Sequence, residues 1–221
     1  MMVKSACCKT HRKEFIFDHN KENMLNQALF TKTNAYKNQF HAAKPFPHVL
    51  IKNFLEKNTA KKLLKALGCE TFSKKESDLF TFYQTCDLIS SNDALFKEFR
   101  ESLLSQRFIS LLETITNIKL SNKRIDLFGS LYQQTHYLLA HDDQLGKRKI
   151  AFIYYLTTLK AKDGGALSLY ASNEGQPTTI AKRIQPTANT FLFFEVSPQS
   201  FHEVEEVLTA TPRISLTGWF Y

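Results

Sequence analysis

The sequence predicts an α+β, mainly β protein in which helices come first and an antiparallel double sheet follows. Two observations lead to this prediction. Between residues 46 and 120, three segments space their apolar residues as amphipathic helices do. After residue 120, seven or eight short apolar stretches alternate with turn-forming segments, which is typical of a β-sandwich or barrel. The helices are expected to cover one face of the sheet.

The length and composition favour one domain with a large core. The chain has 221 residues, of which 19 are Phe. Residues 1–45 are polar and irregular, with helical potential near residues 21–29, so we divide the chain into an N-terminal extension (1–45) and a folded domain (46–221). No apolar run approaches the roughly 20 residues that cross a bilayer, and the N-terminus lacks a signal-type apolar segment. We therefore expect a cytoplasmic protein without membrane contact.

The net charge and the cysteines say less about the function. A formal net charge of +8 favours polyanionic neighbours such as a ribosome, but it is equally explained by a Lys-rich composition. Direct nucleic-acid binding is therefore not the expected function. Cys7, Cys8, Cys69 and Cys86 fit no zinc spacing and are expected to be reduced bystanders.

Residues 46–120 are expected to form two strands as well as the helices. "PFPHVLIKNFL" predicts a short strand at residues 48–52. Thr59 is positioned to cap "AKKLLKAL", with Gly68 as the stop. "DLFTFYQT" alternates as a strand does. Ser91 is expected to cap the helix in "NDALFKEFRESLL", and a second helix at residues 106–116 follows directly.

The strand-rich part supplies the chemistry, first in "LLAHDDQLGKRK". In an extended chain, side chains two residues apart share a face, so His141 and Asp143 point the same way and Asp142 points away. An H-x-D pattern alone is weak. "SPQSFHEVEEV" adds His202 at the start of a later strand. Two histidines and one carboxylate form the set that suits Fe(II), because it leaves coordination positions open. Taken singly, His202 is better explained as a hydrogen-bonded strand residue.

The last strand, "RISLTGWFY", has two chemically different faces. Alternation places Arg213 with the hydroxyls of Ser215 and Thr217 on one face, and apolar side chains on the other. If the apolar face packs on the helices, Arg213 points into the barrel. A buried guanidinium requires an anion, and the chain offers no obvious acid. A bound carboxylate would satisfy it. The alternative is an Arg side chain that extends to solvent from the strand end.

These segments, with "DGGALSLY" and "TFLFFEVSPQSFHEVEEVL", resemble the 2-oxoglutarate- and Fe(II)-dependent oxygenases. More narrowly, the chain from about residue 46 to its end resembles the catalytic domain of the ribosomal prolyl 3-hydroxylases. The resemblance implies a double-stranded β-helix, a cupin-like jelly roll, with N-terminal supporting helices. Eukaryotic members carry a second, non-catalytic domain of similar fold. This chain ends two residues after Trp219, so we expect the single-domain form.

The resemblance also implies roles for individual residues. His141, Asp143 and His202 would hold the iron. Arg213 would bind the far carboxylate of 2-oxoglutarate, with Ser215, Tyr155 and Tyr132 beside it. Trp219 matches a position near the substrate. Tyr155, Tyr132 and Trp219 could equally be core residues, and no further catalytic residue is expected. "DGG" is expected to be only a tight turn.

The function implied is a dioxygenase that uses Fe(II), 2-oxoglutarate and O2, with ascorbate as a stimulant, and releases succinate and CO2. Its expected substrate is a prolyl residue of a partner protein, which would be ribosomal by the closer resemblance. Three alternatives remain at this point: a hydroxylase of a free amino acid or other small metabolite, a non-catalytic binding module on the same fold, and a cupin-like metal enzyme without 2-oxoglutarate.

Overall fold

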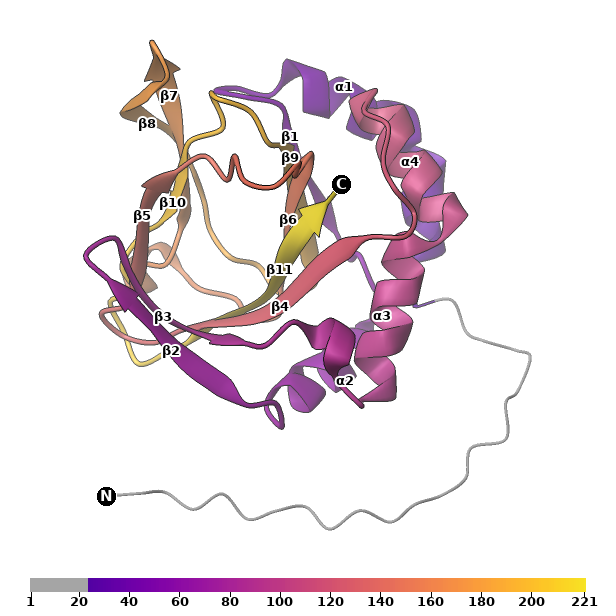
Figure 1. Cartoon of the computed structure of the whole chain (residues 1–221), viewed down its shortest axis with the longest axis horizontal. Coiled ribbons are helices and arrows are strands. Elements are labelled where there is room, and N and C mark those ends of the chain that lie inside the picture. The colour runs from indigo at the N-terminus through magenta and orange to yellow at the C-terminus, as the bar shows by residue number, and fades with distance from the viewer. Residues whose placement is uncertain (1–23) are drawn as a thin grey trace.

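A layer of helices lies against one side of a curled antiparallel sheet (Figure 1). The structure is a computed structural model, and it describes residues 24–221. The helical segments are η1 (Gln27–Lys32), α1 (Thr33–Ala42), α2 (Lys57–Leu67), η2 (Leu88–Ser90), α3 (Ala94–Leu104), α4 (Gln106–Thr116) and η3 (Ala161–Asp163).

The strands pair in a single continuous path. They are β1 (His48–Lys52), β2 (Phe72–Ser77), β3 (Phe80–Thr85), β4 (Ile125–Tyr132), β5 (Tyr137–His141), β6 (Ile150–Tyr155), β7 (Leu167–Asn173), β8 (Gln176–Ile184), β9 (Thr190–Glu195), β10 (His202–Val204) and β11 (Arg213–Phe220). Their order is β1-β9-β6-β11-β4-β3-β5-β10-β7-β8, and β2 pairs with β3 outside this path. The prediction of a mainly antiparallel β domain with supporting helices is confirmed.

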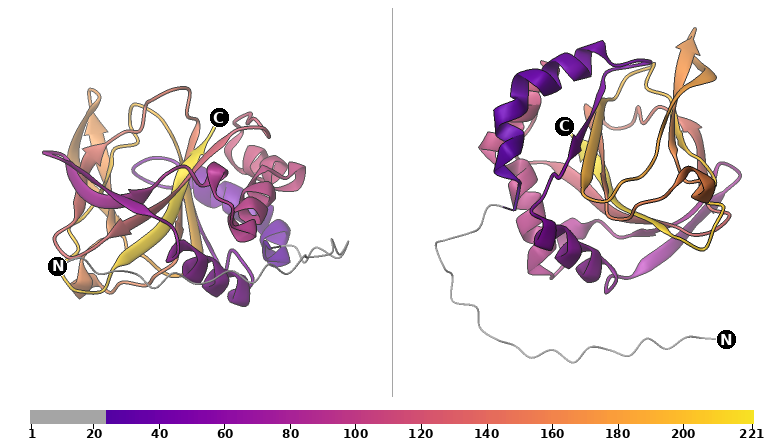
Figure 2. Two further views of the ribbon diagram at one scale, coloured as in Figure 1. Left: turned by 60° about the horizontal axis from the view of Figure 1, so that its bottom comes forward. Right: turned by 180° about the vertical axis from the view of Figure 1, so that it is seen from behind.

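The sheet curls until its two end strands approach each other (Figure 2). A side-chain hydrogen bond joins them: the Lys182 ammonium of β8 donates to Nε2 of His48 in β1, over 2.9 Å. The other ring nitrogen of His48 lies 2.8 Å from the Phe46 carbonyl, to which it must donate. His48 is therefore a neutral imidazole that bridges the seam of the barrel, and it is only 2% exposed.

The outer face of β1, β9, β6 and β11 packs on the helices and forms the larger core. The aromatic rings there stack closely: Phe54 lies 4.3 Å from Phe191, and Phe152 lies 5.3 Å from the same ring, centroid to centroid. Leu216 and Phe220 of β11 belong to this core, as the alternation predicted. Burial of so many large apolar side chains is the main source of stability.

The inner face encloses a second, smaller apolar cluster inside the barrel. It contains Ile153, Leu167, Leu192, Phe194 and Val204, among others. Gly218 allows β11 to lie close to β4, because a Cβ at that position would collide with the backbone carbonyl of Asp126. The sheet therefore has an outer face that holds the fold and an inner face that surrounds a site.

Several local expectations are wrong. Residues 24–45 are not irregular: α1 lies there, and its Phe40 stacks on Phe193 in the core. The part of the expected N-terminal extension before residue 24, including Cys7 and Cys8, lies outside the described residues. Helix α2 begins at Lys57, so Thr59 lies inside it and does not cap it.

The cap of α3 is also not the expected residue. The side chain of Asp93 accepts from Leu95 N and caps the helix. Ser91 instead accepts from Asp93 N and donates to Glu70. Strand β2 was not expected. In the part of the chain that the structure describes, no helix has the length and apolar character needed to cross a membrane.

The seam histidine predicts a pH effect on stability. Burial lowers the pKa of His48, and the nearby Lys182 ammonium lowers it further. As the pH falls below about 6.5, this histidine takes up a proton in the unfolded chain but not in the folded chain. The free energy of unfolding therefore decreases as the pH falls from about 6.5 to the folded pKa of His48. His48→Gln retains an acceptor for Lys182 but does not titrate, so the loss of stability between about pH 7 and pH 5 should be smaller.

The measurement is urea unfolding of both proteins across that range, with a chelator present. The other titrating groups contribute equally to the pH dependence of both proteins. The difference between the two stability curves therefore reports the contribution of His48. Parallel curves for His48→Gln and the parent chain would contradict the buried, neutral state of this imidazole.

Candidate metal and cosubstrate site

Strand pairing brings two histidines face to face inside the barrel. In the β5–β10 ladder His141 lies directly opposite His202, and their ring centroids are 4.2 Å apart. Phe194 of β9 packs against the His202 ring at 4.6 Å. His202 is 4% exposed, so the chemistry of this ring takes place in an apolar surrounding.

Both imidazoles are fixed in the same tautomer by the backbone. Nδ1 of His141 lies 2.9 Å from the Leu139 carbonyl, and Nδ1 of His202 lies 2.8 Å from the Ser200 carbonyl. A carbonyl only accepts, so each Nδ1 carries the hydrogen and each Nε2 presents a lone pair. Such an outer hydrogen bond orients metal-binding histidines.

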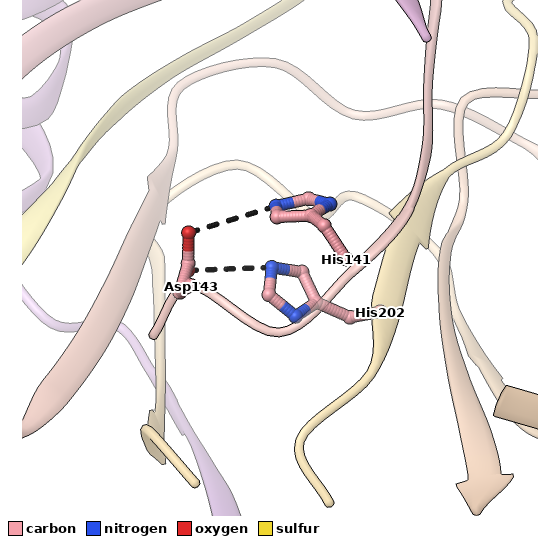
Figure 3. Close-up of side chains that lie close together, drawn as sticks. All are labelled: His141, Asp143 and His202. Carbon is pink, nitrogen blue, oxygen red and sulfur yellow. Dashed lines mark ion pairs between the residues drawn. The ribbon is translucent and has the colours of Figure 1, made fainter. Parts of the chain in front are cut away.

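Asp143 completes the group from the loop that follows β5 (Figure 3). Its Oδ1 lies 3.6 Å from Nε2 of His141, and its Oδ2 lies 3.5 Å from Nε2 of His202. The ligand atoms of the three residues all lie within 4.8 Å of one another. This arrangement of two imidazole nitrogens and one carboxylate is suited to a divalent metal.

The backbone reason given for Asp143 is wrong, although the side chain lies where it was expected. Strand β5 ends at His141, and Asp143 has a φ of 62°, in the left-handed region. Strand alternation therefore does not aim this carboxylate; a turn does. Asp142 turns away, and its carboxylate accepts from the backbone and the side-chain amide of Gln144.

Burial lowers the pKa of His202 to about 4, and the neighbouring His141 adds to this effect. The imidazole is therefore neutral at physiological pH. Metal binding requires the unprotonated ring, so this site has no proton to displace from His202.

Arg213 lies inside the barrel, and no acidic side chain of residues 24–221 forms an ion pair with it. Its side chain is 1% exposed, which excludes an arginine that extends to solvent. Nη1 donates to Ser215 Oγ over 3.4 Å, while Nε and Nη2 have no hydrogen-bond partner among the described residues. The rings of Tyr132 and Tyr155 flank the guanidinium, at 5.1 and 5.2 Å from its central carbon. A buried cation with free donors is a site for a carboxylate.

The tyrosines carry polar groups into this region. Burial raises the pKa of Tyr155, and the Arg213 charge offsets part of the rise. The Tyr155 hydroxyl is buried and has no hydrogen-bond partner of good geometry in the described residues. Burial raises the pKa of Tyr132 as well. Both phenols are therefore neutral donors beside the guanidinium.

A cavity of about 180 Å³ connects the two groups. The three candidate metal ligands, Arg213, Tyr132 and Trp219 line it, whereas Tyr155 and Ser215 are not at its wall. Apolar side chains, including Phe82, Leu138 and Phe194, form much of the rest. The structure thus brings together every site residue that the sequence indicated, with Tyr155 and Ser215 in contact with Arg213 rather than with the cavity.

Three features of the wall were not anticipated. Arg148 lies with its guanidinium carbon 3.5 Å from the centroid of the Trp219 ring. The hydroxyls of Ser130 and Thr217 lie 2.9 Å apart in a hydrogen bond. Gln84 also faces the cavity. Of these, only Thr217 had a signal in the sequence, through its place on the face of Arg213.

Comparison with known proteins agrees with this geometry. Residues 127–221 match the 2OG-Fe(II) oxygenase superfamily. From β4 to its last residue, the chain is thus similar to this superfamily. The donors present fit the two groups that give this family its name: the imidazole and carboxylate set fits Fe(II), and the unpartnered Arg213 fits a carboxylate of 2-oxoglutarate.

A similar protein is the prolyl 3-hydroxylase OGFOD1 of Xenopus laevis, which is 40% identical over 181 residues, covering 80% of this chain and 35% of the relative. The chain therefore spans about a third of the length of such relatives.

Two solved structures share the fold. A prolyl-4-hydroxylase of Pseudomonas putida has a TM-score of 0.67 at 16% identity and covers 85% of this chain and 97% of its own. A prolyl hydroxylase of Trichoplax adhaerens, in complex with a peptide fragment of hypoxia inducible factor, has a TM-score of 0.67 at 19% identity, with coverages of 88% and 91%. The expected double-stranded β-helix is confirmed.

The site predicts which residues bind metal. His141→Ala, Asp143→Ala or His202→Ala should each weaken Mn(II) binding by more than about 100-fold, because loss of an outer partner alone typically costs 10- to 100-fold. Asp142→Ala is the matched control and should bind Mn(II) almost as the parent chain does, since its carboxylate contacts Gln144. Electron paramagnetic resonance of free Mn(II) measures these affinities. Loss of binding in Asp142→Ala with retention in Asp143→Ala would reverse the assignment.

Proposed function

We propose that this chain is a 2-oxoglutarate- and Fe(II)-dependent dioxygenase that hydroxylates a prolyl residue of a protein. The observation that carries the proposal is Arg213: a buried guanidinium with unpartnered donors faces the same cavity as the two-histidine, one-carboxylate group. A metal site alone would fit many enzymes. The anion-binding Arg213 in the same cavity narrows these to enzymes that use a carboxylate cosubstrate.

His141, Asp143 and His202 would hold the iron through Nε2, a carboxylate oxygen and Nε2. Arg213 would bind the distal carboxylate of 2-oxoglutarate, with the Tyr132 phenol as a further donor at the cavity wall. Ser215 and Tyr155 would hold the guanidinium in place. When bound, iron and 2-oxoglutarate would supply the oxygen activation, in which decarboxylation of 2-oxoglutarate to succinate and CO2 accompanies hydroxylation of a C–H bond by O2. Ascorbate would act as a stimulant that keeps iron reduced.

The chain's own residues orient and shield this chemistry. Hydrogen bonds to backbone carbonyls hold the two imidazoles so that their lone pairs converge. Phe82, Leu138 and Phe194 limit water in the cavity, which strengthens the pairing of Arg213 with an anion. No general base is needed for this reaction, and none is assigned.

The choice of a prolyl substrate rests on likeness to relatives. The similar proteins from Xenopus laevis and Drosophila melanogaster are named prolyl 3-hydroxylases. Trp219 lines the cavity near the metal ligands and is assigned to substrate contact. Leu79, Leu139 and Leu145 are exposed on the segments that border cavity residues, and exposed apolar side chains are suited to contact with a polypeptide.

The finer proposal is a cytoplasmic enzyme that acts on a ribosomal protein. It rests on the resemblance of the strand motifs to ribosomal prolyl hydroxylases and on the net charge of +8, which favours anionic surroundings.

The Arg213 assignment predicts the affinity for the cosubstrate. Arg213→Met keeps apolar bulk but removes the charge and five donors. 2-Oxoglutarate should bind about 10- to 100-fold more weakly, since hydrogen bonds to charged groups are among the strong ones. Mn(II) affinity should be retained. Thermal stability without ligand should hold or rise, because an unpaired buried cation is removed.

Calorimetric titration of 2-oxoglutarate into the Mn(II)-loaded, oxygen-free proteins makes the measurement. Arg183→Met, at an arginine of β8 that pairs with Glu205, is the matched control. Arg213→Lys should recover only part of the affinity because an ammonium lacks the planar fork. Equal affinities for Arg213→Met and the parent chain would mean that Arg213 is structural.

The substrate assignment predicts coupled turnover. A proline-containing peptide from a small-subunit ribosomal protein should raise succinate release above the rate without peptide, and mass spectrometry should find one added oxygen atom on the proline. The same peptide with that proline replaced by alanine should release succinate at the background rate. If free L-proline stimulates release as well as the peptide does, the protein-hydroxylase proposal fails while the oxygenase assignment stands.

A further inference from the structure

One arginine contacts both the candidate metal group and an aromatic platform. Arg148 lies just before β6, at the end of the loop that carries Asp143. Its Nη1 lies 3.8 Å from Asp143 Oδ1, and its guanidinium carbon lies 3.5 Å above the Trp219 ring. The side chain is 18% exposed. Arg148 therefore joins the carboxylate to a ring on a different element.

The platform is part of the rigid sheet. Trp219 is paired on both sides, with Asp126 of β4 and Ala151 of β6. Its ring also meets Phe128 edge-on at 6.2 Å. An indole in a strand that is hydrogen-bonded to two neighbours has little freedom to shift. A guanidinium over such a ring gains a cation–π contact, and the planar group stacks well.

The loop needs such an anchor. Asp143, Gly146 and Lys147 all have positive φ angles, so the segment turns sharply. Its backbone closes on itself through Leu145 N to Asp143 O and Arg148 N to Leu145 O. Leu145 is 67% exposed and adds no packing. The position of the Asp143 carboxylate is therefore tied to the place where Arg148 meets the sheet.

We propose that Arg148 is a positioning residue for the metal: stacked on Trp219, it holds the Asp143 carboxylate in the orientation that binds the ion. This inference rests on the proposed role of Asp143 as a ligand. It gives Trp219 a second role that is independent of the substrate, as the surface on which the ligand loop is fixed.

Simple electrostatics gives the opposite expectation, which makes the proposal testable. A cation beside a carboxylate competes with the metal for that carboxylate, so its removal would strengthen metal binding. If Arg148 positions the ligand, its removal weakens metal binding, as loss of an outer partner usually does. The sign of the change separates the two accounts.

The experiment measures Mn(II) affinity by electron paramagnetic resonance, without 2-oxoglutarate, substrate or oxygen. Arg148→Gln should bind Mn(II) about 10- to 100-fold more weakly. Trp219→Leu removes no charge and no ligand, yet it should also weaken binding, because the guanidinium loses its platform. The double variant should lose less than the product of the two single losses, since both act through one contact. Arg148→Lys should restore part of the affinity.

Arg124→Gln is the matched control. Arg124 stacks on Tyr221 at 3.7 Å, so it is a second arginine–aromatic pair, just outside β4 and β11, and Asp143 is not part of it. Its Mn(II) affinity should equal that of the parent chain. Thermal unfolding of each variant without metal identifies any protein that has not folded, and Arg148→Lys then carries the comparison.

Unchanged or tighter Mn(II) binding in Arg148→Gln would overturn the proposal, as would parent-like binding in Trp219→Leu. Asp143→Ala separates this failure from a failure of the site. If Asp143→Ala abolishes Mn(II) binding while Arg148→Gln does not, only the positioning role is lost. If Asp143→Ala binds Mn(II) normally, the metal assignment itself is wrong.

Discussion

Packing of the helices on the outer face of the sheet is the constraint on which the rest of the structure depends. Phe54, Phe191 and Phe152 commit one face of the central strands to the larger core. Because side chains alternate along a strand, the opposite face must then point into the barrel. Arg213 is buried for this reason: Leu216 and Phe220 of the same strand point into the larger core, and Arg213 faces the cavity on the other side of the sheet. The free energy gained by packing the larger core offsets the cost of burying this guanidinium without an acidic partner among the described residues.

The three proposed metal ligands are oriented mainly by backbone geometry. Cross-strand pairing of β5 with β10 sets His141 opposite His202, and carbonyls two residues earlier fix each ring. The third ligand comes from a turn with left-handed backbone at Asp143. Two rigid donors and one on a loop therefore form a group whose geometry depends most on the loop.

The sequence predicted those parts that follow from strong local patterns. β11 is a regular strand with polar residues at every second position, so alternation alone placed Arg213 inside. Alternation was the wrong argument for Asp143, because a turn can direct a side chain to either face. Helix α1 was not predicted because Phe40 is its one fully buried residue and most of its other side chains are polar. Strand β2 is exposed along nearly its whole length and shows no apolar alternation.

Other features have no local signal at all. Arg148 is one basic residue in a basic run, and only the fold brings Trp219 beneath it. The bridge between His48 and Lys182 joins residues 134 positions apart, across an opening that exists only once the sheet has curled. Contacts of this kind depend on the closed shape of the barrel, so a pattern of neighbouring residues cannot reveal them.

The position of Trp219 has a practical consequence. It is the single tryptophan of the 221-residue chain, and it lies at the wall of the cavity between a guanidinium and the sheet. Its indole nitrogen is buried and has no hydrogen-bond partner among the described residues. Tryptophan fluorescence of this protein therefore comes from a single indole at this cavity, and its emission is a built-in optical reporter of what enters there.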